Sequence, residues 1–270
     1  MKKMIAVLAL VLAVFGSISA HADLTNTNAP NWSYNAGTIL MSKYYGTIFG
    51  GTFYDGPMSF TDVNAVRQNR FGNLTFSLML GQKLDRLRNY NKDGGNEYDA
   101  GFDQSFTLGT KAYPILVDVG VLYLAVYDLN KSHDDAFDET IRLDFPIRAD
   151  LPGGPLFQPY VQAYHFHMVG DGLQEVGWIG FAGLIRNQSL GCSLFGNELK
   201  LNIDYRMGVN GGVYESRSGI EYHRLSIGLP IQYGKWSFTP SVIGQLKGGS
   251  DQTYVHENEL FYTLSVRYSF

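Results

Sequence analysis

The chain ends in the stretch Leu260-Phe-Tyr-Thr-Leu-Ser-Val-Arg-Tyr-Ser-Phe270, and this stretch decides the fold. Every second residue from Leu260 to Phe270 is large and apolar, and the residues between them are small or polar, with Phe261 as the exception. A period of two over this length predicts a β-strand with one apolar and one polar face. About ten tilted residues are enough for a strand to cross a bilayer. The stretch therefore fits the wall of a membrane barrel, with the last strand of a soluble β-sandwich as the alternative.

The final residue of the chain is itself aromatic. An alternating last strand that ends in Phe resembles the C-terminal signal of bacterial outer-membrane β-barrels. The resemblance implies that Tyr268 and Phe270 form the signal that the outer-membrane barrel assembly machinery reads. It also implies an outer-membrane location, with the surrounding lipids and lipopolysaccharide as partners.

The N-terminus has the pattern of a secretory signal peptide over residues 1–22. Two lysines precede an apolar run at residues 5–15, and residues 20–22 read Ala-His-Ala, which fits an A-x-A cleavage site. We expect residues 23–270 to form a single barrel domain that begins with a periplasmic leader, residues 23–37. No later stretch offers the roughly 18 consecutive apolar residues of a membrane helix. An exported chain of this kind can span a membrane only as a closed barrel.

The composition agrees with a barrel. Tyr (18), Phe (17) and Gly (31) are abundant, yet the mean hydropathy is only -0.10. A barrel produces this combination because its apolar residues alternate with polar ones. The net charge of -4 and the pI of about 5.8 give no basic surface for nucleic acid. The single cysteine, Cys192, cannot form an internal disulfide, and we expect it to be inert.

Alternation and turn signals divide the mature chain into twelve candidate strands, an even number as in single-chain bacterial barrels. The predicted fold is all-β, a transmembrane antiparallel up-and-down β-barrel of twelve strands, with ten or fourteen as alternatives. The candidate strands are residues 38–49, 57–67, 72–84, 98–111, 114–128, 138–149, 156–169, 173–186, 197–210, 219–231, 234–247 and 257–270.

The connections between these strands alternate in character. If the first strand runs outward from the periplasm, the odd connections are long, polar and Gly-rich, as in residues 85–97 and 129–137, and most even ones are tight, as in residues 112–113. Long loops outside and short turns inside are typical of outer-membrane barrels. Two connections depart from this pattern: residues 170–172 are a short outer connection, and residues 187–196 are a long inner one.

The two faces of the clearest strands differ in charge. In residues 197–210, for example, Leu201 and Ile203 alternate with Asp204 and Arg206. A charge on the lipid face costs roughly 2–4 kcal/mol at the bilayer midplane, so we expect these charges to line the barrel interior. The predicted lumen-lining residues are Asp99, Asp103, Asp118, Arg142, Asp144, Arg148, Lys200, Asp204, Arg206, Arg224 and Arg267.

Opposite charges across a pore orient water and filter ions. The charged residues therefore predict a narrow porin, or channel, for the passive diffusion of small hydrophilic solutes or ions. Alternatively, the charges pair into a plug, and the protein is a closed structural barrel whose extracellular loops bind a partner or a surface polymer. A barrel that hydrolyses lipids is the third alternative.

Three short motifs follow one another early in the mature chain. Residues 42–45 read Ser-Lys-Tyr-Tyr, residues 55–57 read Asp-Gly-Pro, and residues 72–74 read Gly-Asn-Leu. In this order they resemble the start of the TorF-like porins, bacterial outer-membrane β-barrel proteins. That family often has Arg-Gly after the first aromatic residues, where residues 46–47 of this chain are Gly-Thr. The resemblance implies a barrel and solute passage, and it transfers no site residue.

No catalytic residue is predicted. A barrel hydrolase needs a Ser nucleophile with a His base beside it. Known barrel lipases and lipid A deacylases resemble one another in placing His and Ser one or two residues apart. Here His223 and Ser226 are three apart, which puts them on opposite faces of a strand. We therefore expect the protein not to be an enzyme.

Two histidines, His165 and His167, share one face of a predicted strand and make half of a metal site. A third ligand, such as His133 or Asp134, would be needed. We expect rim or lumen residues instead, with no metal and no cofactor. The acidic residues among 133–139 are expected to form a solvated loop, with loose binding of divalent cations as the alternative.

Overall fold

The computed structural model describes residues 32–45, 52–54, 56–69, 72–84, 96–110, 113–127, 133–146, 157–168, 176–212, 218–249 and 257–270. The chain divides into two units, Met1–Trp32 and Ser33–Phe270, and the second contains the sheet described below. The predicted signal peptide lies outside the described residues. None of the described residues belongs to a helix long and apolar enough to cross a membrane.

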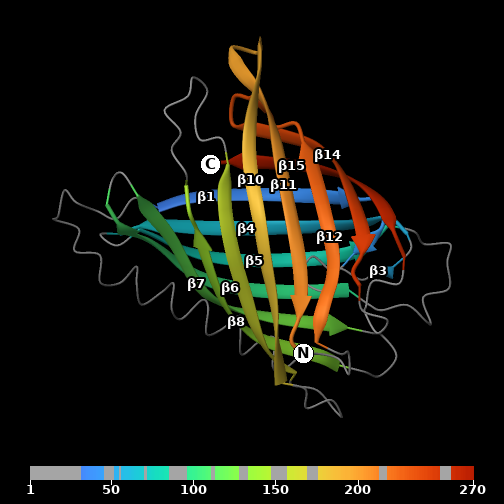
Figure 1. Cartoon of the computed structure of the whole chain (residues 1–270). Coiled ribbons are helices and arrows are strands. Elements are labelled where there is room, and N and C mark those ends of the chain that lie inside the picture. Colours follow the sequence, from blue (N-terminus) through green and yellow to red (C-terminus); the bar gives the residue numbers. More distant parts are fainter. Residues whose placement is uncertain are drawn as a thin grey trace. The chain divides into compact units, whose positions relative to one another are not determined.

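The structure is a closed antiparallel barrel of twelve strands (Figure 1). The strands of the wall are β1 (Trp32–Met41), β4 (Met58–Gln68), β5 (Asn73–Lys83), β6 (Asn96–Gly109), β7 (Pro114–Tyr127), β8 (His133–Asp144), β9 (Gln158–Met168), β10 (Val176–Leu194), β11 (Asn197–Asn210), β12 (Gly219–Gly228), β14 (Trp236–Lys247) and β15 (Glu259–Ser269). Strands β2 (Tyr44–Tyr45) and β3 (Thr52–Tyr54) form a separate hairpin, and β13 (Ile231–Tyr233) pairs with the start of β14. The predicted fold class and the predicted number of strands are confirmed.

The last strand closes the barrel by pairing with the first. β15 lies antiparallel to β1, from Asn35 opposite Ser269 to Met41 opposite Thr263. The Phe270 backbone amide then donates to the Tyr34 carbonyl at 3.0 Å. Strand β15 also pairs along its length with β14, so no edge of the last strand is left open. Closure of this kind leaves neither the first nor the last strand with an open edge, as a barrel that spans a membrane requires.

The two ends of the barrel differ in their connections, and we name them accordingly. The loop end carries the connections at residues 42–57, 85–95, 128–132, 169–175, 211–218 and 248–258. The turn end carries the connections at residues 69–72, 110–113, 145–157, 195–196 and 229–235, together with the start of β1 and the end of β15. Except for residues 145–157, this is the predicted asymmetry of long loops at one end and short turns at the other.

The predicted first strand was misplaced. β1 occupies Trp32–Met41, whereas alternation predicts residues 38–49, so residues 32–37 belong to the wall and not to a leader. The inner face of this part of β1 carries Asn35 and Gly37, which are not apolar and so conceal the strand in the sequence. Their role is explained by the interior, where they lie beside an ion pair.

One of the two predicted irregular connections, residues 187–196, is also corrected, and the other, residues 170–172, lies outside the described residues. β10 runs to Leu194, and Phe195 and Gly196, with φ angles of 51° and 80°, close a two-residue hairpin with β11. Positive φ at both central residues is what such a turn requires. Residues 187–196 are thus strand and tight turn. They do not alternate in sequence because this part of β10 extends past β9, pairs with β11 alone and buries neither face.

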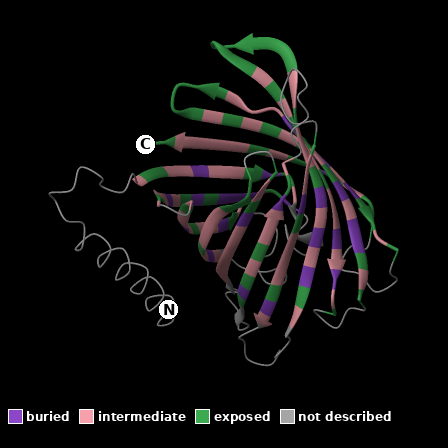
Figure 2. Ribbon diagram, turned by 60° about the vertical axis from the view of Figure 1, so that its left-hand side comes forward, coloured by how far each residue is buried: buried purple, intermediate pink, exposed green. Residues whose placement is uncertain are grey.

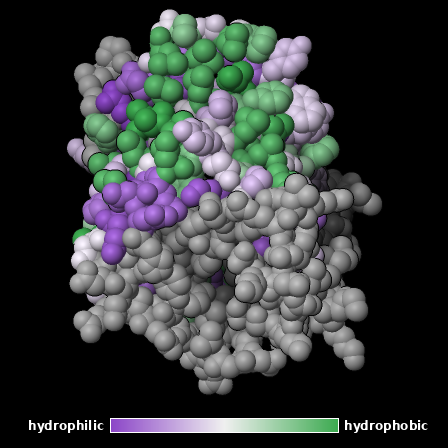
Figure 3. All heavy atoms as spheres, turned by 90° about the vertical axis from the view of Figure 1, so that its right-hand side faces the viewer, coloured by the Kyte–Doolittle hydropathy of each residue, from purple (hydrophilic) through white to green (hydrophobic). Residues whose placement is uncertain are grey.

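Burial alternates along the strands, as Figure 2 shows. On β15, Leu260 and Tyr262 are exposed on the outer face, and Phe261 between them is fully buried on the inner face. Phe261 breaks the small-and-polar pattern of that face because it packs into a cluster inside the barrel. The space-filling view shows hydrophobic residues gathered over a broad area bordered by hydrophilic ones (Figure 3).

Two apolar clusters occupy the barrel interior. One joins Met41, Met58, Phe60, Ile243 and Phe261, all in the half of their strands nearer the loop end. The other consists of Tyr160, Phe166, Ile179, Phe181 and Tyr222.

Glycines on the inner face make room for aromatic rings from the next strand. A Cβ added at Gly81 would lie 2.5 Å from the Phe60 ring, and one added at Gly208 would lie 2.5 Å from the Tyr222 ring. Each ring therefore lies flat across a neighbouring strand in the space that the missing side chain leaves.

Candidate functional site

An ion pair spans three strands of the inner face, from Arg267 near the turn end of β15 to Asp62 in the middle of β4. Arg267 of β15 donates to Asp62 of β4 through both terminal nitrogens, at 2.8 Å and 3.1 Å. The pair crosses β1 at Gly37, where a Cβ would lie 3.3 Å from the Asp62 carboxylate and 3.4 Å from Arg267 Cγ. Asn35 and Asn64 add hydrogen bonds to this group. The Arg267 side chain remains 35% exposed, so this bidentate pair still meets solvent.

A second bidentate pair lies near the turn end of β8. Arg142 donates to Asp144 from Nε at 2.7 Å and from Nη2 at 2.8 Å, and Gln158 of β9 donates to the same carboxylate at 2.8 Å. The guanidinium group lies 4.0 Å from the centre of the Tyr160 ring. The Arg142 side chain is 28% exposed. Like Arg267, it combines a fixed geometry with access to solvent.

Tyr160 links this pair to the next group of charges. Its hydroxyl donates to Asp204 of β11 at 3.0 Å, reaching across β10 at Gly183, over which the ring lies. On the same face, Arg206 lies 5.0 Å from the centre of the Phe181 ring and 5.9 Å from that of Tyr222. Arginine and aromatic side chains thus alternate around this part of the wall.

Arg224, in the middle of β12, has a different environment. Its side chain donates to Gln245 Oε1 from Nε at 2.8 Å and from Nη2 at 2.5 Å, and its guanidinium group lies 4.6 Å from the Tyr222 ring centre. Arg224 is only 3% exposed, and Gln245 is 1% exposed. This arginine is packed into the interior and does not face solvent as Arg142 and Arg267 do.

An acidic group continues the network on β6 and β7. Asp118 lies opposite Arg142 in the register of β7 and β8. Asp103 is a direct neighbour of Asp118, and Asp99, four residues further along β6, is buried. These carboxylates and the two solvent-accessible arginines give the inner face both signs of charge.

The structure places most of the predicted lumen-lining residues on the inner face, with Lys200 and Arg148 as exceptions, and it adds one inward charge, Asp62, that was not predicted. Lys200 is a correction: it lies where β10 and β11 extend beyond their neighbours, and it pairs with Glu198 at 2.9 Å with half of its side chain exposed. Arg148 lies outside the described residues. Asp62, in contrast, was missed, although a mid-strand charge between Phe60 and Asn64 was a signal for it.

The prediction that the acidic residues among 133–139 form a solvated loop is wrong. Residues 133–139 are part of β8, held in register with β7 from His133 opposite Tyr127. Asp138 is fully buried on the inner face. Glu139 points to the other side of the wall, where it contacts both His165 and His167. From the sequence we suggested His133 or Asp134 as a third ligand. Glu139 was not predicted, because the register between β8 and β9 cannot be read from the sequence.

His223 and Ser226 lie on opposite faces of β12, as their spacing predicts. His223 Nδ1 lies 2.8 Å from the Tyr205 hydroxyl on the outer face. Ser226 pairs in register with Asp204 on the inner face. These two residues therefore do not form a nucleophile and base.

The predicted assembly signal lies at the turn end. Tyr268 packs against Trp236 of β14 and against Phe270, with ring centroids 4.8 Å and 5.1 Å apart. Phe270 is largely exposed. An exposed aromatic group at a strand end is typical of the interfacial girdle of a membrane barrel.

A scan against protein-family models and a search of curated proteins find no match for this sequence. Among solved structures, the barrel is similar to LpxR from Salmonella typhimurium, with a TM-score of 0.50 and 10% identity over 87% of this chain and 100% of that chain. It also matches the β domain of the Bordetella autotransporter BrkA (TM-score 0.46, 13% identity, 88% and 99% covered) and the translocator domain of the autotransporter NalP from Neisseria meningitidis (0.46, 13%, 100% and 98%).

These similarities concern the fold. The chain is a closed twelve-stranded antiparallel β-barrel, which confirms the predicted fold class.

Proposed function

We propose that this barrel is a narrow passive channel for small hydrophilic solutes or ions across the outer membrane. The observation that carries the proposal is the solvent access of the arginines in the two turn-end ion pairs, Arg142 at 28% and Arg267 at 35% of the side chain. A plug built of paired charges would bury them. Charged side chains in contact with water inside a barrel bias which ions enter.

The loop-end half of the interior would set the width of the channel. Met58, Phe60 and Phe261 are almost fully buried there. Apolar constrictions in channels limit passage by excluding water. We therefore infer a polar vestibule at the turn end and a narrower, more apolar passage at the loop end.

The rest of the proposal follows the sequence. Residues 1–22 would direct export to the periplasm, and Tyr268 and Phe270 would present the chain to the outer-membrane barrel assembly machinery. The loop end would then face the cell exterior, in contact with lipopolysaccharide. The motifs that resemble the start of the TorF-like porins support a channel. The positions of His223 and Ser226 on opposite faces of β12 argue against a lipid hydrolase at this place.

A closed barrel that acts through its loops is the second candidate. It is favoured by the loop-end cluster, since a continuous apolar layer would seal the interior. Its function would be to bind a partner or a surface polymer outside the cell.

A liposome-swelling assay separates the two candidates. The mature chain is refolded into vesicles, and the uptake of an amino acid, a pentose and a trisaccharide is followed by light scattering. We expect the two smaller solutes to enter and the trisaccharide to be excluded. Replacement of both Arg142 and Arg267 by Gln should change the relative rates of anionic and cationic amino acids. A folded barrel that admits no solute would contradict the channel and support the closed barrel.

A further inference from the structure

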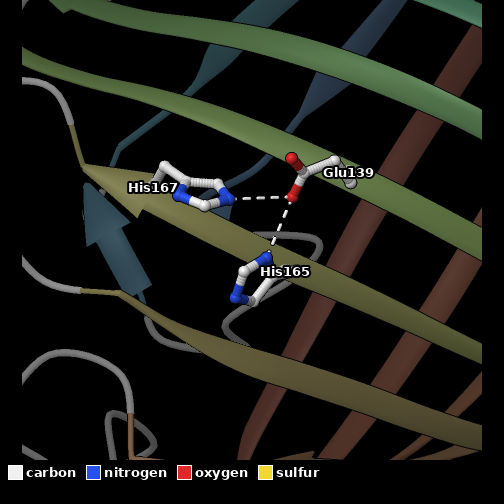
Figure 4. Close-up of side chains that lie close together, drawn as sticks. All are labelled: Glu139, His165 and His167. Atoms are coloured by element: carbon white, nitrogen blue, oxygen red, sulfur yellow. Dashed lines mark hydrogen bonds and ion pairs between the residues drawn. The ribbon is translucent and has the colours of Figure 1, made fainter.

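Three side chains of metal-ligand type converge on one point of the barrel wall. His165 and His167 project from β9 and Glu139 from the adjacent β8 (Figure 4). Glu139 Oε2 lies 2.9 Å from His165 Nδ1 and 2.9 Å from His167 Nε2. One ligand atom from each residue lies within 4.8 Å of the other two. Two imidazole nitrogens and a carboxylate oxygen thus share one small volume.

The burial of their neighbours places these residues on the outer face. Phe166, between the two histidines, is 1% exposed and packs in the interior cluster. Asp138, next to Glu139, is fully buried. Glu139, His165 and His167 have side-chain exposures of 50%, 49% and 37%. The group therefore lies on the opposite side of the wall from the interior charges, close to the loop end, since β9 ends at Met168.

The surrounding outer face is apolar, which makes the group unusual for its position. Ile141 of β8, Val161 of β9 and Trp178 of β10 are all exposed large hydrophobic residues on this face. Lipid-facing charges are costly except near the membrane interface. Their concentration at one point near the strand ends indicates a specific site.

The backbone register holds the three ligands in place. Glu139 lies directly opposite His165 across the β8–β9 ladder, and His167 is two residues further along the same face. Opposite and diagonal neighbours on one face of an antiparallel pair are within reach of each other. The hydrogen bonds from both imidazoles to one carboxylate oxygen keep the side chains converged without a metal.

The chemistry of this donor set selects a class of metal. Two His and one Glu form a ligand set found in zinc sites that keep a fourth position open for water. Zinc bonds to nitrogen and oxygen are about 2.0–2.2 Å long, so tetrahedral ligand atoms lie roughly 3.5 Å apart, which modest side-chain rotations would reach. Imidazole suits Zn²⁺, Cu²⁺ and Ni²⁺, whereas Mg²⁺ and Ca²⁺ take oxygen ligands.

We propose that Glu139, His165 and His167 form a binding site for a zinc-class divalent cation on the outer face of the barrel, near its loop end. The two imidazole nitrogens and one carboxylate oxygen supply three ligands. The fourth position faces outward and is filled by water. The site is independent of the channel proposed above, because no residue of the interior network takes part in it.

Metal binding to the refolded mature protein in detergent micelles tests the proposal. The wild-type chain is titrated with Co²⁺, whose visible absorption reports tetrahedral coordination, and bound Co²⁺ is then displaced with Zn²⁺. We expect one ion per chain and displacement by Zn²⁺ but not by Mg²⁺ or Ca²⁺. Binding should weaken as the pH falls, because protons compete for the imidazoles.

The variants His165→Gln and His167→Gln should each weaken Zn²⁺ binding by at least about tenfold, as the loss of a ligand implies. His223→Gln is the matched control, because His223 also lies on the outer face but contacts Tyr205 of β11 and is not one of the three ligands. It should bind Zn²⁺ as the wild type does, since it removes none of the three ligands. Folding of each variant is checked by its heat-dependent migration on denaturing gels.

Two outcomes would overturn the proposal. One is a wild-type protein that gives no tetrahedral Co²⁺ spectrum and does not bind Zn²⁺ at micromolar concentration. The other is equal binding by wild type and by a folded His167→Gln variant. If both histidine variants fail to fold, the wild-type titration alone still decides, since a cluster that only hydrogen-bonds β8 to β9 gives no Co²⁺ spectrum.

Discussion

Arginines on the inner face lie in two different environments. At the turn end, Arg142 and Arg267 form bidentate pairs with aspartates and remain 28% and 35% exposed. In the middle of β12, Arg224 is bonded to the neutral Gln245, stacked on Tyr222 and 3% exposed. The same residue type therefore serves packing in one region and presents charge to water in the other. This contrast separates the part of the interior that maintains the barrel from the part that can act on a solute.

The largest expected effect comes from the loop-end cluster. Phe261 is fully buried among Met58, Phe60 and Ile243. Phe261→Ala should lower the free energy of unfolding by about 3–5 kcal/mol, because it removes a buried ring and leaves a cavity. Urea titration of the refolded protein, followed by tryptophan fluorescence, measures the change. Tyr262→Ala is the control on the outer face of the same strand and should cost less than half as much; equal losses would mean that the interior is not packed.

The next largest effects on stability are expected when the arginines of the inner face are replaced. Arg224→Met should destabilise the barrel by about 2–3 kcal/mol, since Gln245 loses its partner in a buried place. Arg267→Met should cost no more than about 1 kcal/mol, because exposed ion pairs contribute little, yet it should alter ion selectivity. The two variants are compared by urea titration and by reversal potential. A larger stability loss for Arg267→Met would reverse the assignment of the two regions.

Glycines beneath the aromatic rings should be sensitive to a single methyl group. Gly208→Ala places a Cβ 2.5 Å from the Tyr222 ring, and such overpacking typically costs about 1–3 kcal/mol. At Gly244, a Cβ would meet nothing within 4 Å, so Gly244→Ala should change stability by no more than about 0.5 kcal/mol. Both midpoints are read from the same urea titration. Indistinguishable midpoints would show that the ring over Gly208 is free to move away.

The smallest effect on stability is expected from labelling Cys192. This labelling shows which end of the barrel faces the cell exterior. Cys192 is exposed on the hairpin that extends from the turn end. A maleimide that cannot cross membranes should therefore label it in lysed cells and not in intact ones, without a change in unfolding. The control is Gly249→Cys in a Cys192→Ser background, at the loop end, which should be labelled in intact cells. If Cys192 were labelled in intact cells and Gly249→Cys only in lysed cells, the barrel would have the opposite orientation in the membrane.

Alternation in the sequence was sufficient to predict the fold, the number of strands and most of the inward charges. In β11 (Asn197–Asn210), for example, the predicted and observed bounds are the same. Alternation failed where a strand does not separate an apolar face from a polar one. The start of β1 has Asn35 and Gly37 on its inner face, and the end of β10 buries neither face.

Pairings between strands could not be predicted, because they depend on register. Asp62 and Arg267 are far apart in sequence and meet across β1 only when the barrel closes. Glu139 reaches His165 and His167 through the β8–β9 register in the same way. The sequence thus gives the residue types of a site on each strand, and the closed barrel gives their partners.

Single-channel recording of the refolded mature protein in a planar bilayer tests the central claim most directly. We expect discrete conductance steps whose reversal potential in a salt gradient shifts when Arg142 and Arg267 are both replaced by Gln. The same shift should not follow from Lys200→Gln, since Lys200 lies on the hairpin beyond the wall. A correctly folded barrel that gives no conductance, or one whose ion selectivity does not change when both arginines are replaced, would mean that these arginines do not line a channel.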